Sequence, residues 1–273
     1  MKIALIQQRA TRDKPQNIAR GLANLETAAR NGAQLVCYAE LAFEWFHPQH
    51  PAAGDVRSLA EPVDGPLVCA FRDKAREFGM VVVLNFFERR NGETFDASPV
   101  IDADGSLMGV TRMVHITEYA CFHEQGYYTP GDQGAPVFRT RAGNIGVAIC
   151  YDRHFPEYMR ALALAGADLV VVPQAGAVGE WPEGLYEAEM RVAAFQNGYF
   201  VALCNRVGQE DRLDFAGESF VCAPDGSVIA RAGQGTEEIL YAEVELASAA
   251  SSHARQLFMK HRRPELYGRW LAK

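Results

Sequence analysis

The feature that most constrains the fold is a short apolar run, an amphipathic stretch and a second apolar run at the start of the chain. Residues 2–7 are typical of a buried strand, and residues 17–30 carry apolar side chains at helical spacing. Residues 35–39 then form a second strand-like run. A strand–helix–strand order of this length predicts parallel pairing of the two strands. The chain therefore favours an α/β fold.

The same order recurs along the chain. A helix is expected at 66–78 and a strand at 80–87, and two Asn-Gly or Asp-Gly turn signals predict an antiparallel meander between 87 and 111. The elements expected in the second half are a strand at 145–150, a helix at 156–165, a strand at 168–172, a helix at 183–196 and strands near 199–205, 219–223 and 228–230. Two β-rich halves, each with helices on one side, predict two sheets packed face to face in one domain spanning 1–273.

Composition excludes several classes of function. The hydrophobic fraction of 48% and charged fraction of 22% are ordinary for a globular protein, and the net charge of −7 argues against a nucleic-acid or anionic-membrane partner. The apolar runs are too short for a transmembrane helix, and the first residues lack the pattern of a signal peptide. Six cysteines without a CxxC pair fit a reducing compartment, so a cytoplasmic location is expected.

Cys150 closes the apolar run 145–150, where a strand is expected to end. Catalytic groups in α/β proteins gather at the carboxyl ends of strands, and Pro156 can open the helix that follows. The polar residues 152–154 come directly after the thiol, and a nearby cation or helix N-terminus would lower its pKa. Cys150 is therefore a candidate nucleophile, with a buried structural cysteine as the alternative.

Two glutamates are candidate acid–base groups. Glu40 ends the strand-like run 35–39 among apolar neighbours, where burial would raise its pKa and make it a usable general base. An N-cap or ion-pair role for Glu40 is the alternative. Glu124 is the second candidate; a metal site with Cys121 and His123 is also conceivable, but this short cluster lacks the paired spacing of a zinc site. We expect no metal and no cofactor.

The motifs of this chain, taken in order, resemble the nitrilase, or carbon–nitrogen hydrolase, superfamily nearly from end to end. The segments that carry the resemblance, besides those around Glu40, His115 and Glu124, are 98–105, 127–131, 149–153, 205–208 and 262–267. The resemblance implies a single-domain, four-layer αββα sandwich that dimerises. It also implies that the C-terminal tail, about 248–273, packs on a partner subunit.

The resemblance implies a catalytic set in which Glu40 is the base, Cys150 the nucleophile and Glu124 a second carboxylate. The family's lysine is missing, because the motif Arg-Lys-x-His reads Arg-Met-Val-His at 112–115 and Met113 occupies the lysine position. A thioether donates no hydrogen bond, and losing one oxyanion donor costs on the order of 10²–10³ in rate. If 112–115 is extended, His115 lies on the same side as Met113 and could partly substitute.

The segments 150–154 and 189–191 resemble the branch that hydrolyses N-carbamoyl amino acids, including β-ureidopropionase. In that branch an arginine at the position of Arg153 holds the substrate carboxylate, as a bidentate guanidinium suits. An ion pair of Arg153 with Asp152 or Glu157 is the alternative. Tyr151, with its backbone N–H, Tyr128 and His115 complete the expected substrate-binding residues.

These features predict a cysteine-dependent hydrolase that cleaves a small non-peptide C–N bond, in an amide or N-carbamoyl amino acid, through a thioester. A catalytically impaired or non-catalytic ligand-binding paralogue is one alternative, and nitrilase or amidotransfer activity is another. The expected partners are a small amide, carbamoyl or carboxylate-bearing substrate and further copies of the chain, as a homodimer or higher homo-oligomer.

Overall fold

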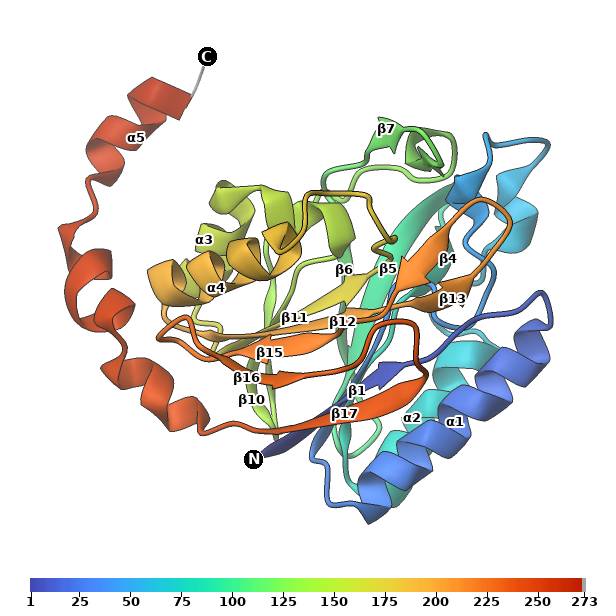
Figure 1. Cartoon of the computed structure of the whole chain (residues 1–273), viewed down its shortest axis with the longest axis horizontal. Coiled ribbons are helices and arrows are strands. Elements are labelled where there is room, and N and C mark those ends of the chain that lie inside the picture. Colours follow the sequence, from blue (N-terminus) through green and yellow to red (C-terminus); the bar gives the residue numbers. More distant parts are fainter. Residues whose placement is uncertain (272–273) are drawn as a thin grey trace.

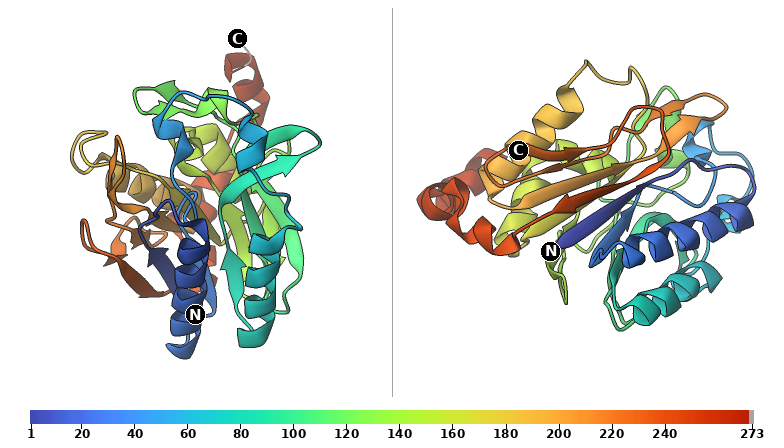
Figure 2. Two further views of the ribbon diagram at one scale, coloured as in Figure 1. Left: turned by 90° about the vertical axis from the view of Figure 1, so that its right-hand side faces the viewer. Right: turned by 60° about the horizontal axis from the view of Figure 1, so that its bottom comes forward.

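The structure, a computed structural model, describes residues 1–271 and consists of two β-sheets packed face to face between two pairs of helices (Figures 1 and 2). Helices α1 and α2 cover one sheet, and α3 and α4 cover the other. The expected four-layer αββα sandwich is therefore confirmed. The helices are α1 (Lys14–Arg30), α2 (Pro66–Phe78), α3 (Pro156–Leu164), α4 (Leu185–Asn197) and α5 (Pro264–Leu271).

The first sheet has seven strands in the order β17-β1-β2-β3-β5-β4, with β6 paired to β5. Strands β1, β2 and β3 are parallel, as the opening strand–helix–strand pattern predicts, and the meander β4-β5-β6 is antiparallel. Its strands are β1 (Lys2–Gln7), β2 (Leu35–Tyr38), β3 (Val81–Val83), β4 (Phe86–Arg90), β5 (Glu93–Ile101), β6 (Leu107–Arg112) and β17 (Glu238–Glu243).

The second sheet has six strands in the order β16-β15-β12-β11-β10-β9, with β10, β11 and β12 parallel. Its strands are β9 (Val137–Thr140), β10 (Gly143–Val147), β11 (Leu169–Gln174), β12 (Phe200–Asn205), β15 (Phe220–Cys222) and β16 (Val228–Arg231). Two small ribbons lie outside the sheets: β7 (Glu118–Tyr119) with β8 (Phe122–His123), and β13 (Val207–Gln209) with β14 (Asp214–Ala216).

Helix α1 begins at Lys14, three residues before the stretch expected from periodicity. The Asp13 side chain accepts a hydrogen bond from the backbone N–H of Gln16 at 3.0 Å, which satisfies one of the free donors of the first turn. Pro15, in the first turn, already has the backbone angle of a helix and needs no hydrogen bond there. Local capping, and not the apolar stripe, sets this boundary.

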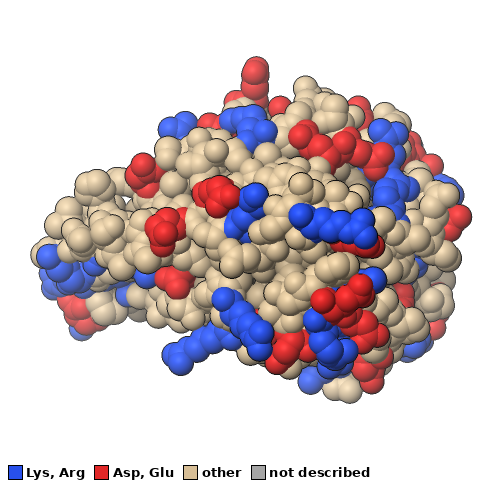
Figure 3. Space-filling view, turned by 90° about the horizontal axis from the view of Figure 1, so that it is seen from below, with Lys and Arg blue, Asp and Glu red and all other residues tan. Residues whose placement is uncertain are grey.

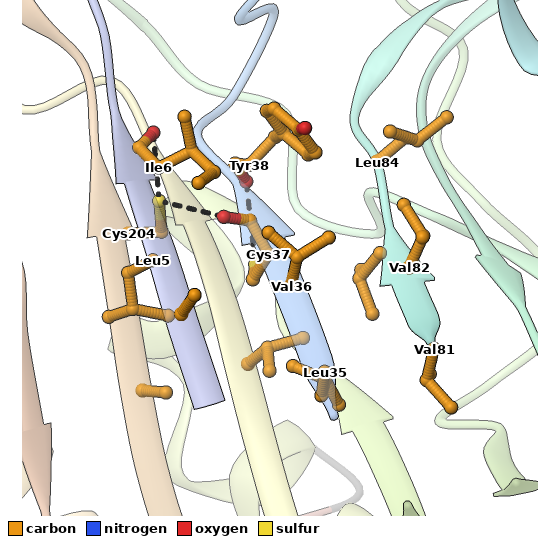
Figure 4. Close-up of a cluster of buried hydrophobic side chains, with 14 of the residues drawn as sticks. Leu5, Ile6, Leu35, Val36, Cys37, Tyr38, Val81, Val82, Leu84 and Cys204 are labelled. Carbon is orange, nitrogen blue, oxygen red and sulfur yellow. Dashed lines mark hydrogen bonds between the residues drawn. The ribbon is translucent and has the colours of Figure 1, made fainter. Parts of the chain in front are cut away.

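The two sheets meet along β1, β2 and β12, where the side chains are buried (Figure 4). The Cys204 thiol, on β12, donates to the carbonyl oxygens of Ile6 at 3.5 Å and Cys37 at 3.4 Å in the other sheet. Cys37, Cys204 and Cys222 are all buried. This close packing holds the ends of β2 and of the second sheet's strands in fixed relative positions.

After β17 the chain runs through three short helical segments, Leu246–Ser251, Ala254–Phe258 and Met259–His261, to α5. The segment Ala254–Phe258 packs against α4, whereas α5 extends away from the body of the molecule (Figure 1). It exposes large apolar side chains, including Trp270 at 60%. Residues 272 and 273 of the expected interface tail lie outside the described residues.

Acidic and basic side chains alternate over the face shown in Figure 3, without a large area of one sign. Exposed ion pairs within one helix, such as Lys74 with Glu77 at 2.8 Å, contribute little to stability. None of the helices formed by residues 1–271 combines the length and the apolar character needed to cross a membrane.

Candidate active site

Cys150 lies just beyond β10, at the start of a 3₁₀ turn that spans Cys150–His154. Its backbone has φ of +41°, in the left-handed region that is strained for a residue with a side chain. The turn is held by the Arg153 guanidinium, whose Nη1 donates to the Cys150 carbonyl at 2.8 Å. The residue is only 6% exposed, so a reactant must be small or must enter a narrow opening to reach the sulfur.

Glu40 lies just beyond β2 and is fully buried. Two side chains fix the turn around it. Asn85 Oδ1 accepts the backbone N–H of Leu41 at 2.7 Å, and Arg206 Nη1 donates to the Glu40 carbonyl at 2.9 Å. Within residues 1–271, neither carboxylate oxygen of Glu40 has a hydrogen-bond partner. The structure therefore aims an unpaired carboxyl group into the interior.

Glu40 and Cys150 face each other, and burial dominates the charge state of both. Burial, followed by the Glu124 carboxylate, raises the pKa of Glu40 to about 8. Burial, followed by Glu40, also raises the pKa of the Cys150 thiol, against the smaller lowering effect of Arg153. The expectation that neighbouring polar groups lower the pKa of this thiol is therefore wrong, because desolvation outweighs the cation. A thiol in this state needs a base.

Glu124 opens a 3₁₀ turn, Glu124–Gly126, and is completely buried. Its Oε2 accepts the Thr117 backbone N–H at 3.3 Å, whereas Oε1 has no partner among residues 1–271. Burial and the carboxyl group of Asp96 raise its pKa. Tyr128 lies near the same acids. Burial raises the pKa of its hydroxyl, and the carboxyl groups of Asp96, Glu40 and Glu124 raise it further. The expected residues Glu40, Cys150, Glu124 and Tyr128 thus share one buried site.

Met113 follows β6 and is fully buried in the same core as Cys150 and Tyr151. Its backbone N–H donates to the Asp96 carbonyl at 2.9 Å, and its carbonyl accepts from Gly131 at 2.7 Å. The position carries no ammonium group. The cations that influence the pKa of Glu40 or Cys150 are Arg206 and Arg153, which both donate to the backbone of the turns that carry these side chains.

His115 does not lie in an extended segment beside Met113, because β6 ends at Arg112. The chain turns there, and the Asp152 carboxylate receives the backbone N–H of His115 at 3.0 Å and contacts its Nδ1 at 2.7 Å. The imidazole also stacks on Phe155, with ring centroids 3.5 Å apart. His115 is thus oriented toward the start of α3, and the predicted alignment with Met113 is wrong.

Arg153 lies beneath the nucleophile turn and is 4% exposed. Its Nη1 donates to Gln174 Oε1 at 2.8 Å as well as to the Cys150 carbonyl, and its guanidinium lies 4.6 Å from the Tyr186 ring centroid. Its acidic partner is Glu189, at 3.5 Å from Nε, and not the Asp152 or Glu157 that the sequence suggested. Neither Nε nor Nη2 has a hydrogen-bond partner within the described residues.

Several residues of the site carry no signal in the motifs. Asp96 is a fully buried carboxyl group in the middle of β5, where a lone acid in a small-residue run is the one available hint. Glu180 accepts hydrogen bonds from the hydroxyls of Tyr119 and Tyr186. Cys150 influences the pKa of both tyrosines, which places them close to the thiol.

A cavity of about 540 Å³ adjoins this region, with Tyr186 and Trp181 in its wall. Neither Cys150 nor Glu40 lines it, so it is a separate hollow beside the candidate site.

The residues of the alternative metal cluster do not converge. His123 contacts Glu118 at 2.7 Å, while Glu124 points into the site described above. Across residues 1–271, no group of three or more His, Cys, Asp and Glu side chains could hold a metal ion.

The family model described as carbon-nitrogen hydrolase matches residues 2–254. The chain belongs to this family. Its relatives include N-carbamoylputrescine amidase of Solanum lycopersicum, at 32% identity over 97% of this chain and 93% of the relative. Citrullinase of Francisella tularensis is 31% identical over 98% of this chain and 96% of its own length. Beta-ureidopropionase of Arabidopsis thaliana is 33% identical over 91% of this chain and 65% of its own.

The fold is also similar to solved structures. The carbon-nitrogen hydrolase of Helicobacter pylori G27 superposes with a TM-score of 0.93 at 29% identity, over 99% of this chain and 98% of that one. A Glu-to-Gln mutant of the amidase of Nesterenkonia sp. AN1, solved after Michael addition of acrylamide at its active-site cysteine, has a TM-score of 0.84 at 26% identity. The superposition with this amidase covers 99% of each chain.

Proposed function

We propose that the protein hydrolyses the C–N bond of a small ureido or amide compound, with Cys150 as nucleophile and Glu40 as general base. The observation that carries this proposal is the strained turn that holds the Cys150 thiol against a buried, unpaired glutamate. The names of the relatives, all hydrolases of carbamoyl compounds, support a ureido substrate. The amidase with acrylamide on its cysteine supports the nucleophile.

In this mechanism the ionised Glu40 takes the thiol proton and the Cys150 sulfur attacks the carbonyl carbon. The C–N bond then breaks, and the leaving ammonia or amine departs with the proton that Glu40 held. A thioester, or a thiocarbamate from a ureido compound, remains on the sulfur. Water next attacks this carbonyl carbon and gives a proton to Glu40, and the C–S bond breaks as Glu40 returns that proton to the sulfur, which restores the thiol and the ionised base.

Negative charge develops on the substrate oxygen in both attacks. The Tyr151 backbone N–H, which follows the nucleophile, is our candidate donor to this oxygen. Met113 cannot add a second donor, because a thioether has no N–H or O–H group. We expect the protein to turn over slowly for this reason, since one missing donor costs on the order of 10²–10³ in rate.

Arg153 and Glu180 are the candidates to bind the part of the substrate that lies away from the cleaved C–N bond. Arg153 could bind a carboxylate through Nη2, which has no partner within residues 1–271. However, its Nη1 already holds the Cys150 carbonyl, so we favour a role in shaping the nucleophile turn. Glu180, beside Tyr119 and Tyr186, would instead suit a cationic or neutral tail.

Met113 supports a second candidate function, the binding of an amide-like ligand without turnover. The candidate site is complete except for the position that a cation would occupy. Both candidates use the same residues, so they differ in whether a covalent adduct forms and is released.

A substrate panel with two readouts separates these candidates. The panel contains N-carbamoylputrescine, citrulline, N-carbamoyl-β-alanine and simple amides, and ammonia release is followed together with intact-protein mass. We expect ammonia release on at least one ureido compound, and loss of both ammonia and adduct in Cys150→Ala. A stable adduct without turnover would mark a crippled hydrolase, and neither signal would favour the binding protein. Cys69→Ala is the matched control for removing a thiol.

We also propose that the chain forms homo-oligomers through the C-terminal tail, 248–273, whose described part exposes large apolar side chains, Leu257 and Trp270 among them. A cytoplasmic location is proposed as well, because all six cysteines are free and unpaired thiols persist in a reducing compartment.

A further inference from the structure

Asp96 lies directly opposite the position where the expected cation is missing. Strands β5 and β6 pair with Ala97 opposite Arg112, and the Met113 backbone N–H donates to the Asp96 carbonyl at 2.9 Å. The next facing pair is therefore Asp96 and Met113. Directly opposed residues of an antiparallel pair project their side chains to the same face. A carboxyl group thus lies next to the thioether.

The Asp96 carboxyl group also faces Glu40. Asn85 connects the two residues, because its Oδ1 accepts the Leu41 N–H beside Glu40 while its Nδ2 donates to Asp96 Oδ1. The other Asp96 oxygen and both Glu40 oxygens are buried without a partner among residues 1–271. The two acids face each other, and no donor lies between their free oxygens. A proton held between the two carboxyl groups would supply the missing hydrogen bond.

Among residues 1–271, no cationic side chain forms an ion pair with the carboxyl group of Glu40 or Asp96. The titratable or charged side chains that act on Glu40 or Asp96 are Glu124, Cys150, Asp152, Tyr128 and Arg206. Arg206 is committed to backbone carbonyls and to Glu210. Asp152 is held by His115. Two carboxylates in contact in a desolvated site cannot both be ionised, as like charges raise the pKa of one of them.

We propose that Asp96 keeps its proton when Glu40 ionises and donates it in a hydrogen bond to the Glu40 carboxylate. This proton lets an anionic base exist in a buried site that has no ammonium group. Asp96 is then a positioning residue that acts through Glu40. The inference extends the proposed role of Glu40, but the proton on Asp96 can be observed without turnover.

The proposal assigns a proton count to the pair at each pH. Burial and its neighbours raise the pKa of Glu40 to about 8, and burial and Glu40 raise the pKa of Asp96 well above its usual range. If Asp96 keeps its proton as proposed, the pair holds two protons below the titration of Glu40 and one proton, on Asp96, above it. Such a pair titrates as a unit, and the first step forms the base.

The first test is the rate at which iodoacetamide modifies Cys150 as a function of pH, followed by mass of the labelled peptide. We expect the wild-type rate to rise with a midpoint near pH 8. In Asp96→Asn the side-chain oxygen can still face Asn85 and the amide N–H can face Glu40, so the variant imitates a protonated Asp96 and keeps this midpoint. In Asp96→Leu no donor remains, and we expect the midpoint to rise by about 1 pH unit or more.

If Asp96 were instead ionised, Asp96→Asn would remove a negative charge and the midpoint would fall, which overturns the proposal. Glu40→Gln should abolish the midpoint. If the midpoint persists in that variant, it belongs to another group, and the base role of Glu40 fails independently of the proton on Asp96. Asp73→Asn, at an exposed residue of α2, is the control and should follow the wild type.

Infrared spectroscopy tests the proton directly in the resting protein. At pH 9 the difference spectrum between wild type and Asp96→Asn should contain the carbonyl band of a protonated carboxylic acid. A difference spectrum that contains only carboxylate bands would overturn the proposal, whatever the alkylation rates show.

Discussion

At the scale of single residues, the candidate site is rich in buried acids, and Met113 lies where the family resemblance implies a lysine. We predict that Met113→Lys raises kcat by roughly 10²-fold, because it restores one charge-assisted donor to the developing oxyanion. Lysine and methionine have similar unbranched stems, so the pocket should accommodate the change. The new ammonium would lie opposite Asp96, which it would pair with and ionise.

The measurement is kcat/KM for wild type, Met113→Lys and Met113→Leu on the best substrate of the panel. The leucine variant keeps the apolar character and size, so it should leave the rate nearly unchanged. A loss of activity in Met113→Lys from a measurable wild-type rate would mean that the site works around the thioether, and the idea of a missing donor would be wrong.

Sequence reasoning reached some of these residues and missed others for identifiable reasons. Glu40 and Cys150 could be predicted because both follow apolar runs, and strand ends meet at one edge of a sheet. Asp96 could not be predicted, since it lies within a strand and only the cross-strand register brings it beside Met113. The direction of the Cys150 pKa was mispredicted because a sequence does not reveal how deeply a turn is buried.

At the scale of elements, periodicity predicted the parallel strands and most helices, and local contacts set their limits. Strand β17 pairs with β1 and closes the first sheet, with Leu240 opposite Leu5 across 235 residues of sequence, and no local pattern predicts such a pairing. Strand β6 ends at Arg112 because Asp152, a residue of the second half of the chain, accepts the His115 backbone N–H and turns the chain away from the strand direction. Long-range contacts of this kind lie outside the reach of sequence patterns.

The C-terminal tail contacts its own body, for example Phe258 on Phe195 of α4, but leaves large apolar side chains exposed. We predict that Phe258→Asp weakens the homo-oligomer, because an exposed aromatic side chain at an interface would be replaced by a charge that is costly to bury. Light scattering on purified protein over a range of concentrations measures the mass. Ile229→Asp, at an exposed apolar residue of β16, is the control. An unchanged mass in Phe258→Asp would contradict the proposed interface.

At the scale of the whole molecule, the buried acids link stability to pH. The pKa values of Glu40, Asp96 and Glu124 are all raised in the folded state, so the folded protein binds more protons than the unfolded chain above about pH 4.5. The free energy of unfolding that these groups contribute therefore falls as pH rises from about 5 to 8. The lowered pKa of Glu44 acts in the opposite direction, but below this window.

We predict that wild type loses stability between pH 5.5 and 8.5 and that Glu40→Gln flattens this dependence. With a folded-state pKa of about 8, Glu40 alone accounts for roughly 3 kcal/mol of the loss in this window, because about 1.4 kcal/mol is lost per pH unit until the pH approaches 8. Glutamine keeps the shape of protonated glutamate and has no proton to lose, so the variant should be the more stable protein at pH 8.5. Urea unfolding at three pH values, with a reductant present, measures the difference. Glu183→Gln, at an exposed position, should keep the wild-type slope, and an equal slope in Glu40→Gln would show that the ionisation of Glu40 does not limit stability.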